Sequence, residues 1–432
     1  MLTSDRGFLG LGQAVITAIA LVGLAACGST YGTGTGDGGG TPPPPTAVAV
    51  AYCSGLEPAW VAFQDGDGAW TRVLPSSAAG RVTFDAPFSS TRGAVATLNR
   101  SDNLTFASVL YGTPAELETV GDTNPRDCGP FAAKTLLGTV AGLGTDDVAF
   151  VSGPFFSRVR ARVDNTFEVK ALPSGPRDLL GMLTNGAGAV TGFILRRDID
   201  LPDSTTMPVL DYAAPEAFAP AVANVSLLGL GGESATTGTQ VLTSNAEIAV
   251  TLQTNPTTDV TRPYVALPET QLLPGDLQTL SASVSAINGS ARSATLYFRA
   301  PTDRTLTLGA PLNPPTFTTV ATAPLLQLRA HFVPQNDYDR SAVITYQQGT
   351  TTIVVVSMTA AYAALTGAGY DLVVPDLSSA AGFDPAWTLH PGEAVLWNAV
   401  RIGGTLGMGR DAAPSDGTNR RSVSGIGTIA AQ

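Results

Sequence analysis

The side chains that most often carry out catalysis are scarce in this chain, which has two histidines among its 432 residues. A histidine beside a carboxylate can act as a general base, because its charge changes near neutral pH. His331, however, lies in an alternating segment typical of a strand, and His390 precedes a Pro-Gly pair typical of a turn. We therefore expect structural roles for both histidines and no enzymatic activity.

The motifs that position nucleophiles, metals or phosphates in common enzymes are also missing. The sequence has no H-E-x-x-H pair, no G-x-S-x-G elbow and no Gly-rich loop that ends in G-K-S or G-K-T. A Gly-rich segment at 229–232 has no alternating strand and helix pattern around it, so we interpret it as a turn. We predict that the chain uses no cofactor.

Closely spaced aspartates are the remaining candidates for acid–base chemistry. Asp146 and Asp147 are adjacent, and Asp337 and Asp339 are separated by one residue. A glycosidase needs two carboxyl groups held across a cleft, and neighbours in a loop do not provide that arrangement. We therefore interpret both pairs as solvated loop charges.

A further acidic motif, DGDG at 65–68, separates two strand-like runs at 60–64 and 69–73. A calcium loop of the EF-hand type would need an oxygen ligand at the next alternate position, which is Ala69. Asp and Gly between two alternating runs are instead typical of a hairpin turn. We predict a β-hairpin here and no metal site.

Four tryptophans raise the question of carbohydrate binding, because sugar rings stack on exposed indoles. Trp60 and Trp70 flank the predicted turn and can form a cross-strand pair in a core, and the run around Trp397 is typical of a buried strand. Trp387 follows an Asp-Pro pair, and we expect it to be the most exposed of the four. It is the candidate ligand contact.

Cys27 ends an apolar run at 8–26 that contains Gln13, Thr17 and several glycines and follows Arg6, which is the layout of a signal peptide. The sequence Leu24-Ala25-Ala26-Cys27 resembles the lipobox of bacterial lipoproteins. This resemblance implies that residues 1–26 are removed and that Cys27 is acylated, so that more than one chain holds the protein on a membrane. An uncleaved membrane anchor is the alternative. Gly28 after the cysteine implies the outer membrane, by the same resemblance.

Residues 27–46 follow as a linker. The segment has no large apolar side chain except Tyr31, is rich in Gly and Thr, and ends in a run of four prolines at 42–45. Gly-rich chains are flexible and proline runs are stiff and extended. Fully extended, residues 28–46 reach about 60 Å, so we expect the folded part to stand away from the bilayer.

Cys53 and Cys128 are the two cysteines that remain when Cys27 carries lipid. An exported location permits a disulfide between them, which we predict within a β-sandwich domain at 47–134. A loop of about 75 residues closed in this way stabilises the fold by up to about 4.5 kcal/mol. Two separate buried thiols are the alternative. Either way, no cysteine is left for a His/Cys metal site.

The segment 135–215 contains G-x-V-x-G-L at 138–143, an aromatic strand around Phe167, and Leu172-Pro173-Ser174-Gly175. It resembles the carboxypeptidase-regulatory-like, transthyretin-like β-sandwich. The resemblance implies that Phe167 fills the core, that the Pro and Gly set a turn, and that the module carries no catalytic residues. Asn165 departs from the family pattern, which has a glycine before the aromatic residue.

Short alternating runs separated by Gly and Pro continue through 222–410, and the composition of 47 glycines and 31 prolines suits strands joined by turns. We predict an all-β protein with two or three β-sandwich domains of the Ig-like or transthyretin-like kind. The apolar run 353–358 predicts a central strand. Residues 411–432 are polar and Gly-rich, and we expect them to form a loose tail.

The net charge is −11, and no basic block interrupts it. Such a chain repels phosphate backbones, so nucleic acid is not an expected partner. We expect a lipid-anchored, non-enzymatic protein of the bacterial cell envelope, structural or ligand-binding, whose partners are the membrane and an envelope protein or a glycan. A glycan-binding adhesion protein and an envelope hydrolase with an unrecognised site are the alternatives.

Overall fold

The structure, a computed structural model, describes residues 48–432 except 56, 79–80, 102–103, 119–133, 153–157, 162–164, 173–174, 246, 251–255, 287 and 407–412. The described part is all-β: strands form six sheets, and the two α-helices are short, with four and seven residues. The predicted fold class is confirmed. The lipobox, the linker and Cys128 lie outside the described residues.

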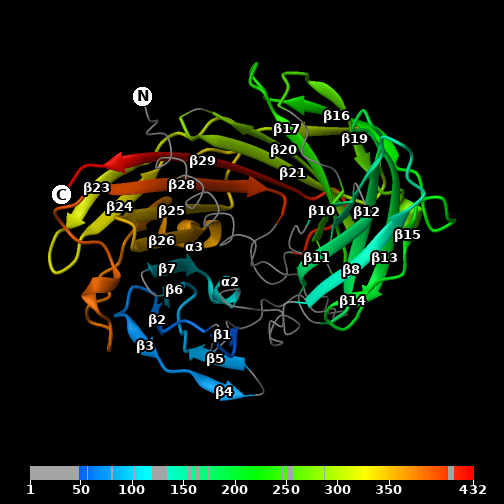
Figure 1. Ribbon diagram of the computed structural model, residues 1–432. Helices are drawn as coiled ribbons and strands as arrows, with labels where there is room; N and C mark the ends of the chain where they lie inside the picture. The colour runs from blue at the N-terminus through cyan, green and yellow to red at the C-terminus, as the bar shows by residue number, and fades with distance from the viewer. Residues whose placement is uncertain are drawn as a thin grey trace, which may run out of the picture.

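One twelve-stranded sheet runs through the molecule and passes across the middle of Figure 1. In pairing order its strands are β18 (Glu247–Ala249), β17 (Thr236–Leu242), β20 (Leu277–Ser285), β21 (Ala291–Phe298), β29 (Asn419–Ile429), β28 (Val395–Gly404), β25 (Ser341–Gln348), β26 (Thr352–Thr359), β7 (Leu104–Gly112), β6 (Gly93–Ser101), β2 (Trp60–Asp65) and β3 (Thr71–Val73). β26 is a central strand, as its apolar run predicts.

The long sheet crosses the domain boundaries predicted from the sequence. β7 belongs to the segment 47–134 and β26 to 222–410, yet the two strands pair in parallel, with Phe106 opposite Ile353 and Val109 opposite Val356. The two segments therefore share one sheet instead of forming separate sandwiches. Parallel neighbours come from distant parts of a chain, so local sequence patterns do not reveal them.

The predicted loose tail at 411–432 is wrong for residues 419–429. These residues form β29, which pairs with β21 on one side and with β28 on the other. Its glycines are a packing requirement: a Cβ built on Gly427 would lie 2.5 Å from the Trp397 ring. Because small residues here make room for a neighbouring indole, a Gly-rich sequence forms an internal strand.

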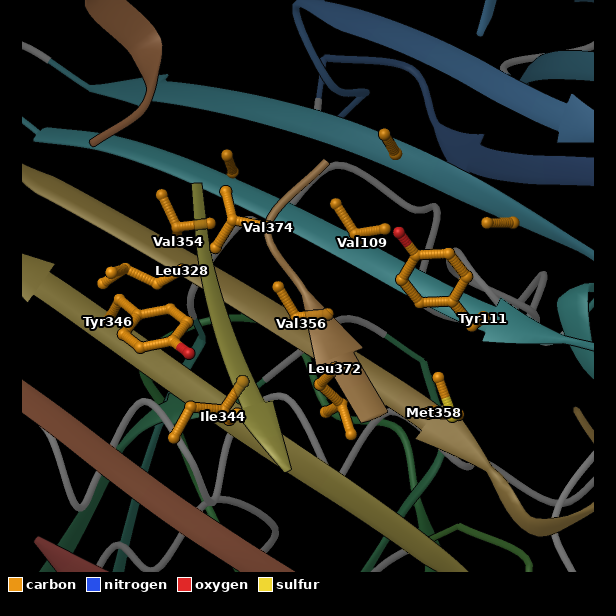
Figure 2. Packing of buried hydrophobic residues seen from close by; sticks show 14 of the residues in the cluster. Val109, Tyr111, Leu328, Ile344, Tyr346, Val354, Val356, Met358, Leu372 and Val374 are labelled. Carbon is orange, nitrogen blue, oxygen red and sulfur yellow. The ribbon is translucent and has the colours of Figure 1, made fainter. Parts of the chain in front are cut away.

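One face of the long sheet, called the first face here, is covered at two places by three-stranded sheets. Over β7, β26, β25 and β28 lies the sheet of β23 (Thr316–Ala321), β24 (Gln327–Phe332) and β27 (Tyr370–Val373). Figure 2 shows Val356, Ile344 and Tyr346 of the long sheet directed at Leu328 and Leu372 of this cover. Over β20 and β21 lies the sheet of β19 (Thr261–Ala266), β16 (Ala221–Leu228) and β22 (Arg304–Thr307).

The opposite face, called the second face, is covered at the β2–β6 end by β1 (Val48–Cys53), β5 (Arg81–Ala86) and β4 (Ser76–Ala78). Two short helices close this region: α2 (Pro114–Leu117), with a capping box between Thr113 and Glu116, and α3 (Ala360–Thr366), capped by Thr359. Glu116 also accepts a hydrogen bond from Thr359 Oγ1 at 2.7 Å, which ties the two helices together. The 3₁₀ turns are η3 (Glu269–Gln271) and η4 (Pro385–Trp387).

Residues 134–211 form a separate β-sandwich at the other end of the molecule (Figure 1). One sheet contains β10 (Arg158–Ala161), β9 (Val148–Ser152), β12 (Arg177–Thr184) and β13 (Val190–Ile199). The other contains β11 (Thr166–Leu172), β8 (Lys134–Ala141), β14 (Thr205–Thr206) and β15 (Leu210–Asp211). Their inner faces enclose a core of their own.

Phe167 is 3% exposed and fills this core, as predicted. It lies opposite Gly138, where a Cβ would come within 2.2 Å of the Phe167 ring. The first glycine of the motif at 138–143 therefore makes room for the aromatic residue. Asn165 has a φ of 56°, in the left-handed region that favours glycine and, after it, asparagine. Asn165 thus supplies the backbone conformation that a glycine would give.

The sandwich is fixed to the long sheet by a buried apolar contact. Leu180, Met182 and Phe193 of the sandwich pack against Val241 and Leu267 of the C-terminal half. The connecting segment is held as well, because Phe193 and Phe218 exchange two backbone hydrogen bonds of 2.9 Å. The two parts consequently bury a shared core.

Beside this core, Arg197 links two buried carboxylates. Its guanidinium lies 3.3 Å from Asp178, which belongs to the sandwich, and 2.6 Å from Asp276, which precedes β20. Asp178 and Asp276 are 1% and 3% exposed. Their remaining bonds come from the backbone N–H groups of Asp198 and Leu273. One arginine therefore compensates two buried charges across the contact.

Replacement of Arg197 by methionine should lower the free energy of unfolding by about 3 kcal/mol or more, because two buried carboxylates lose their cation. Urea unfolding followed by far-UV circular dichroism measures the change. Arg329→Met, at an ion pair whose arginine side chain is 45% exposed, is the matched control and should change stability by less than about 1 kcal/mol. Equal effects of the two substitutions would show that the Arg197 link does not stabilise the fold.

Removal of residues 419–432 should make the protein insoluble, because β21 and β28 each lose a pairing partner and expose an edge. Val423, which is 1% exposed, allows a gentler test. Val423→Asp should lower the free energy of unfolding by about 3 kcal/mol or more. Thr428→Asp, at an exposed position of the same strand, should have little effect. A soluble, fully folded truncated protein would restore the interpretation as a tail.

Candidate functional site

Two of the predicted site residues, Cys27 and Cys128, lie outside the described residues, and Cys53 ends β1, with its backbone paired to Arg81. Lipidation and the disulfide stay predictions. In the part of the chain that the structure describes, no helix combines the length and the apolar character needed to cross a membrane.

The DGDG motif forms the turn between β2 and β3, so the predicted hairpin is confirmed. Asp65 accepts hydrogen bonds from the backbone N–H groups of Ser89 and Ser90 at 3.0 and 2.9 Å, and Asp67 pairs with Arg92. Burial acts to raise the pKa of Asp65, but the hydrogen bond from the Ser89 hydroxyl, together with those from the Ser90 and Ser89 backbone, outweighs it, and the pKa is lowered. An open depression of about 650 Å³ adjoins the turn. The Asp65 carboxylate that lines it already accepts hydrogen bonds from Ser89 and Ser90.

His331 lies on the outer side of β24, where its side chain is 50% exposed. Asp371 of the neighbouring strand β27 is opposite it, with 3.8 Å between His331 Nδ1 and Asp371 Oδ1. Arg329 approaches the same carboxylate at 3.6 Å. The group is a row of polar side chains on the surface of a sheet, with His331 and Arg329 half-exposed.

His390 follows the buried Leu389 and is held through its backbone. Its N–H donates to Gln348 Oε1 at 2.8 Å, and its carbonyl accepts from Gln348 Nε2 at 2.7 Å, while the imidazole is exposed. The residue precedes a turn, as the Pro-Gly pair predicts. Its contacts position a loop and not a reacting group.

The paired aspartates lie in turns and loops, as predicted. Asp147 accepts a hydrogen bond from the backbone of Gly144 at 2.8 Å. Asp337 accepts one from the backbone of Ala310 at 3.0 Å and lies 3.5 Å from Arg421. In the described residues no three His, Cys, Asp or Glu side chains converge as a metal site would require.

Trp387 is less exposed than the sequence suggests. It is half-buried against the main core, in edge contacts with Trp60 and Phe383 at ring distances of 6.4 and 5.6 Å. Trp60 and Trp70 are buried core residues, as predicted, but the β2–β3 register places Thr71 opposite Phe63 and so does not pair them. The role of Trp387 as a ligand contact stays a prediction.

A polar surface that the sequence analysis missed lies on the second face of the long sheet. Side chains at alternate positions of β17, β20, β21 and β29 point to this face and are half-exposed. We call it the hydroxyl face; its members are Thr236, Ser281, Ser283, Ser293, Thr295, Ser422 and Ser424. Two pairs are in direct contact across strands: Thr236 with Ser283 at 2.8 Å, and Ser293 with Ser422 at 2.7 Å.

The same face continues onto β28 and β25, where it is buried: Val343, Val400 and Ile402 form a small apolar cluster there and are 8%, 6% and 2% exposed. Asn398 and Thr345 lie opposite each other and are both 4% exposed, and Gln347 lies opposite Leu396. In the described structure Asn398 Oδ1 and Gln347 Oε1 are buried and have no hydrogen-bond partner. We call Asn398 and Gln347 the amide corner. Unpaired buried acceptors are rare in folded proteins.

The signal for the hydroxyl face is present in the sequence as serines at every second position, in 281–285 and 422–424. That alternation shows which residues share a face. It does not show that β17, the β20–β21 hairpin and β29 place their hydroxyls in common rows.

No protein family model matches the chain, and no curated protein has a similar sequence. The geometry of the described residues therefore carries the functional argument.

Replacement of Trp387 by alanine should lower the free energy of unfolding by about 2 kcal/mol, because its contacts with Trp60 and Phe383 are structural. Far-UV circular dichroism in urea measures this without relying on the lost indole. Leu74→Ala, at a side chain that is 70% exposed, should be neutral. Unchanged stability of the Trp387 variant would indicate that the indole is free for ligand contact.

Proposed function

We propose that this chain is a lipid-anchored, non-enzymatic protein of the bacterial cell envelope, which holds a rigid β scaffold away from the membrane and binds a ligand on it. The observation that carries the scaffold part of the proposal is the fixed contact between the sandwich and the long sheet. Arg197 with its two buried carboxylates, and the apolar core beside it, join parts that flexible connections would otherwise leave independent.

The anchor part of the proposal is supported by the lipobox resemblance at Leu24–Cys27 and by the composition of the linker that follows. A Gly/Thr segment with a proline run is suited to separate a folded domain from a bilayer. The resemblance at Gly28 supports the outer membrane as the location. A disulfide between Cys53 and Cys128 belongs to the same proposal, because it requires an exported protein.

The non-enzymatic part is supported by the setting of the groups that could act as acids or bases. His331 is on an open sheet surface, and His390 is held by Gln348 through its backbone only. Catalytic groups more often lie in a shaped cavity that excludes water. A binding role suits a broad, half-exposed polar face better than a catalytic role does.

The anchor is tested by Cys27→Ser in the native bacterial host or a related one. The unaltered protein should partition into the detergent phase of a Triton X-114 extraction and carry the added mass of acyl chains. The variant should lose both, because the thiol is the acylation site in the lipobox. Cys53→Ser is the control and should keep the lipid. An unchanged partition of the Cys27 variant, with no lipid mass on the unaltered protein, would end the lipoprotein proposal.

A further inference from the structure

Arg420 is an unpaired cation on a face that is otherwise free of charge. Between β17 and β25 the described side chains that share the second face include one charged residue, Arg420. It is partly exposed, and in the described part of the chain its guanidinium has no hydrogen-bond partner and no carboxylate at ion-pair distance. Other arginines of the same strands differ, because Arg421 lies 3.5 Å from Asp337 and Arg292 pairs with Glu233. The Arg420 guanidinium therefore keeps its donors for a ligand.

The strand register sets Arg420 in a cross-strand row of the hydroxyl face. Arg420 lies opposite Thr295 of β21, and Thr295 lies opposite Ser281 of β20. Directly opposed residues of antiparallel strands point to the same face, with their Cβ atoms about 5 Å apart. The row ends in a glycine on each side, since Gly404 of β28 is opposite Arg420 and Gly238 of β17 is opposite Ser281. We call these five residues the Arg420 strip; it is a low part of the surface in which the arginine is the largest side chain.

A second row of hydroxyls runs beside the Arg420 strip. From β29 to β17 its members, each opposite the next, are Ser422, Ser293, Ser283 and Thr236. They are in contact in pairs, but a hydroxyl has one donor and two acceptor positions, so a single contact leaves it able to bind a ligand as well. Within the strip, the Thr295 hydroxyl has no hydrogen-bond partner among the described residues. The surface around Arg420 thus presents many groups that donate and accept hydrogen bonds.

The Arg420 strip is open, whereas the neighbouring part of the second face is closed. Arg420, Thr295 and Ser281 are partly exposed, while Val400 and Ile402 of β28 are 6% and 2% exposed. The amide corner belongs to the closed part and takes no part in the inference. Figure 1 shows β20, β21 and β29 side by side, so the open part extends across adjacent strands.

The chemistry of the strip matches a sugar that carries a carboxylate. A planar guanidinium binds a carboxylate through two parallel N–H donors. The hydroxyls beside it exchange hydrogen bonds with the hydroxyls of a sugar ring. One cation compensates one anionic group, and a polymer with a charge on every unit would meet the field of a molecule whose net charge is −11. A ligand with sparse charge among neutral sugar units therefore fits best.

Given the proposed function of a binding scaffold, on which this inference rests, we propose that the Arg420 strip binds an acidic sugar within an otherwise neutral glycan. The carboxylate of that sugar pairs with Arg420, and the hydroxyls of the same and the adjoining unit exchange hydrogen bonds with Thr295 and Ser281. Added salt weakens the binding, because dissolved ions screen a charge pair that is partly exposed.

The test is isothermal titration calorimetry on the full chain in detergent, with two probes of equal length. One is aldotetraouronic acid, a 4-O-methylglucuronate joined to xylotriose, and the other is the uncharged xylotetraose. The acidic probe should bind with a Kd of about 1 mM or tighter, and xylotetraose about ten-fold more weakly or worse. Arg420→Gln should weaken binding of the acidic probe by about ten-fold or more. The melting temperature should stay unchanged, because Arg420 has no structural partner in the described part of the chain.

Two matched controls separate the strip from the rest of the surface. Arg100→Gln removes the same charge at an exposed position of β6 and should leave the affinity unchanged. Thr295→Val removes a hydroxyl and keeps the shape, so it should weaken binding of the acidic probe by about three-fold or more. Thr305→Val makes the same change at an exposed position of β22 and should have no effect.

Absence of binding of the acidic probe, equal affinity for xylotetraose, or equal effects of Arg420→Gln and Arg100→Gln would each overturn the proposal. So would equal affinity for inorganic phosphate, which would show an adventitious ion only, or tighter binding of hexagalacturonate. Binding of xylotetraose alone would overturn the acidic ligand and leave the binding scaffold standing. The lipid anchor is measured separately by detergent partition, so its failure is distinguishable from failure of this surface.

Discussion

The parallel pairing of β7 with β26 is the contact on which the remaining architecture depends. It joins the first part of the chain to the last, so that one sheet extends from β3 to β18. Each three-stranded sheet then finds its place by covering part of one face of this long sheet. Without the join, the inner sides of β6 and β7 would lose the cover provided by β24 and β27, which come from the C-terminal half.

The Arg197 link has a different role, because it sets the position of the sandwich relative to the long sheet. A buried ion pair contributes little net stability over an apolar contact of the same shape, since the charges must lose their water. Its directional hydrogen bonds do, however, distinguish one arrangement of the two parts from others. The apolar contact around Phe193 provides the adhesion, and Arg197 with Asp178 and Asp276 provides the orientation.

The β7–β26 pairing and the Arg197 link together explain why the second face is suited to a binding role. A ligand that spans several strands benefits when the strands are already held at fixed spacing, because little ordering is needed on binding. Small hydroxyl side chains also lose little conformational entropy when they make contacts.

Much of the fold could be predicted from local pattern. Alternating apolar residues indicated strands, the DGDG motif indicated its hairpin, and Phe167 was correctly expected in the core of the module at 135–215. The first two depend on neighbours in the sequence, whereas the Phe167 expectation came from the family resemblance of the segment 135–215. Asn165 shows the limit of family patterns, because it differs from the expected glycine and still supplies the same left-handed backbone.

The sequence by itself determined the strand-and-turn character of the chain, its charge, and the apolar segment that ends at Cys27. Only the tertiary structure decided which strands pair. It placed Asn419–Ile429 inside the sheet and Trp387 partly against the core. It also assembled the hydroxyl face from four separate strands. The physical reason is that an alternation of period two separates two faces of a strand, whereas the choice of neighbour, and hence of what covers each face, depends on contacts between residues hundreds of positions apart.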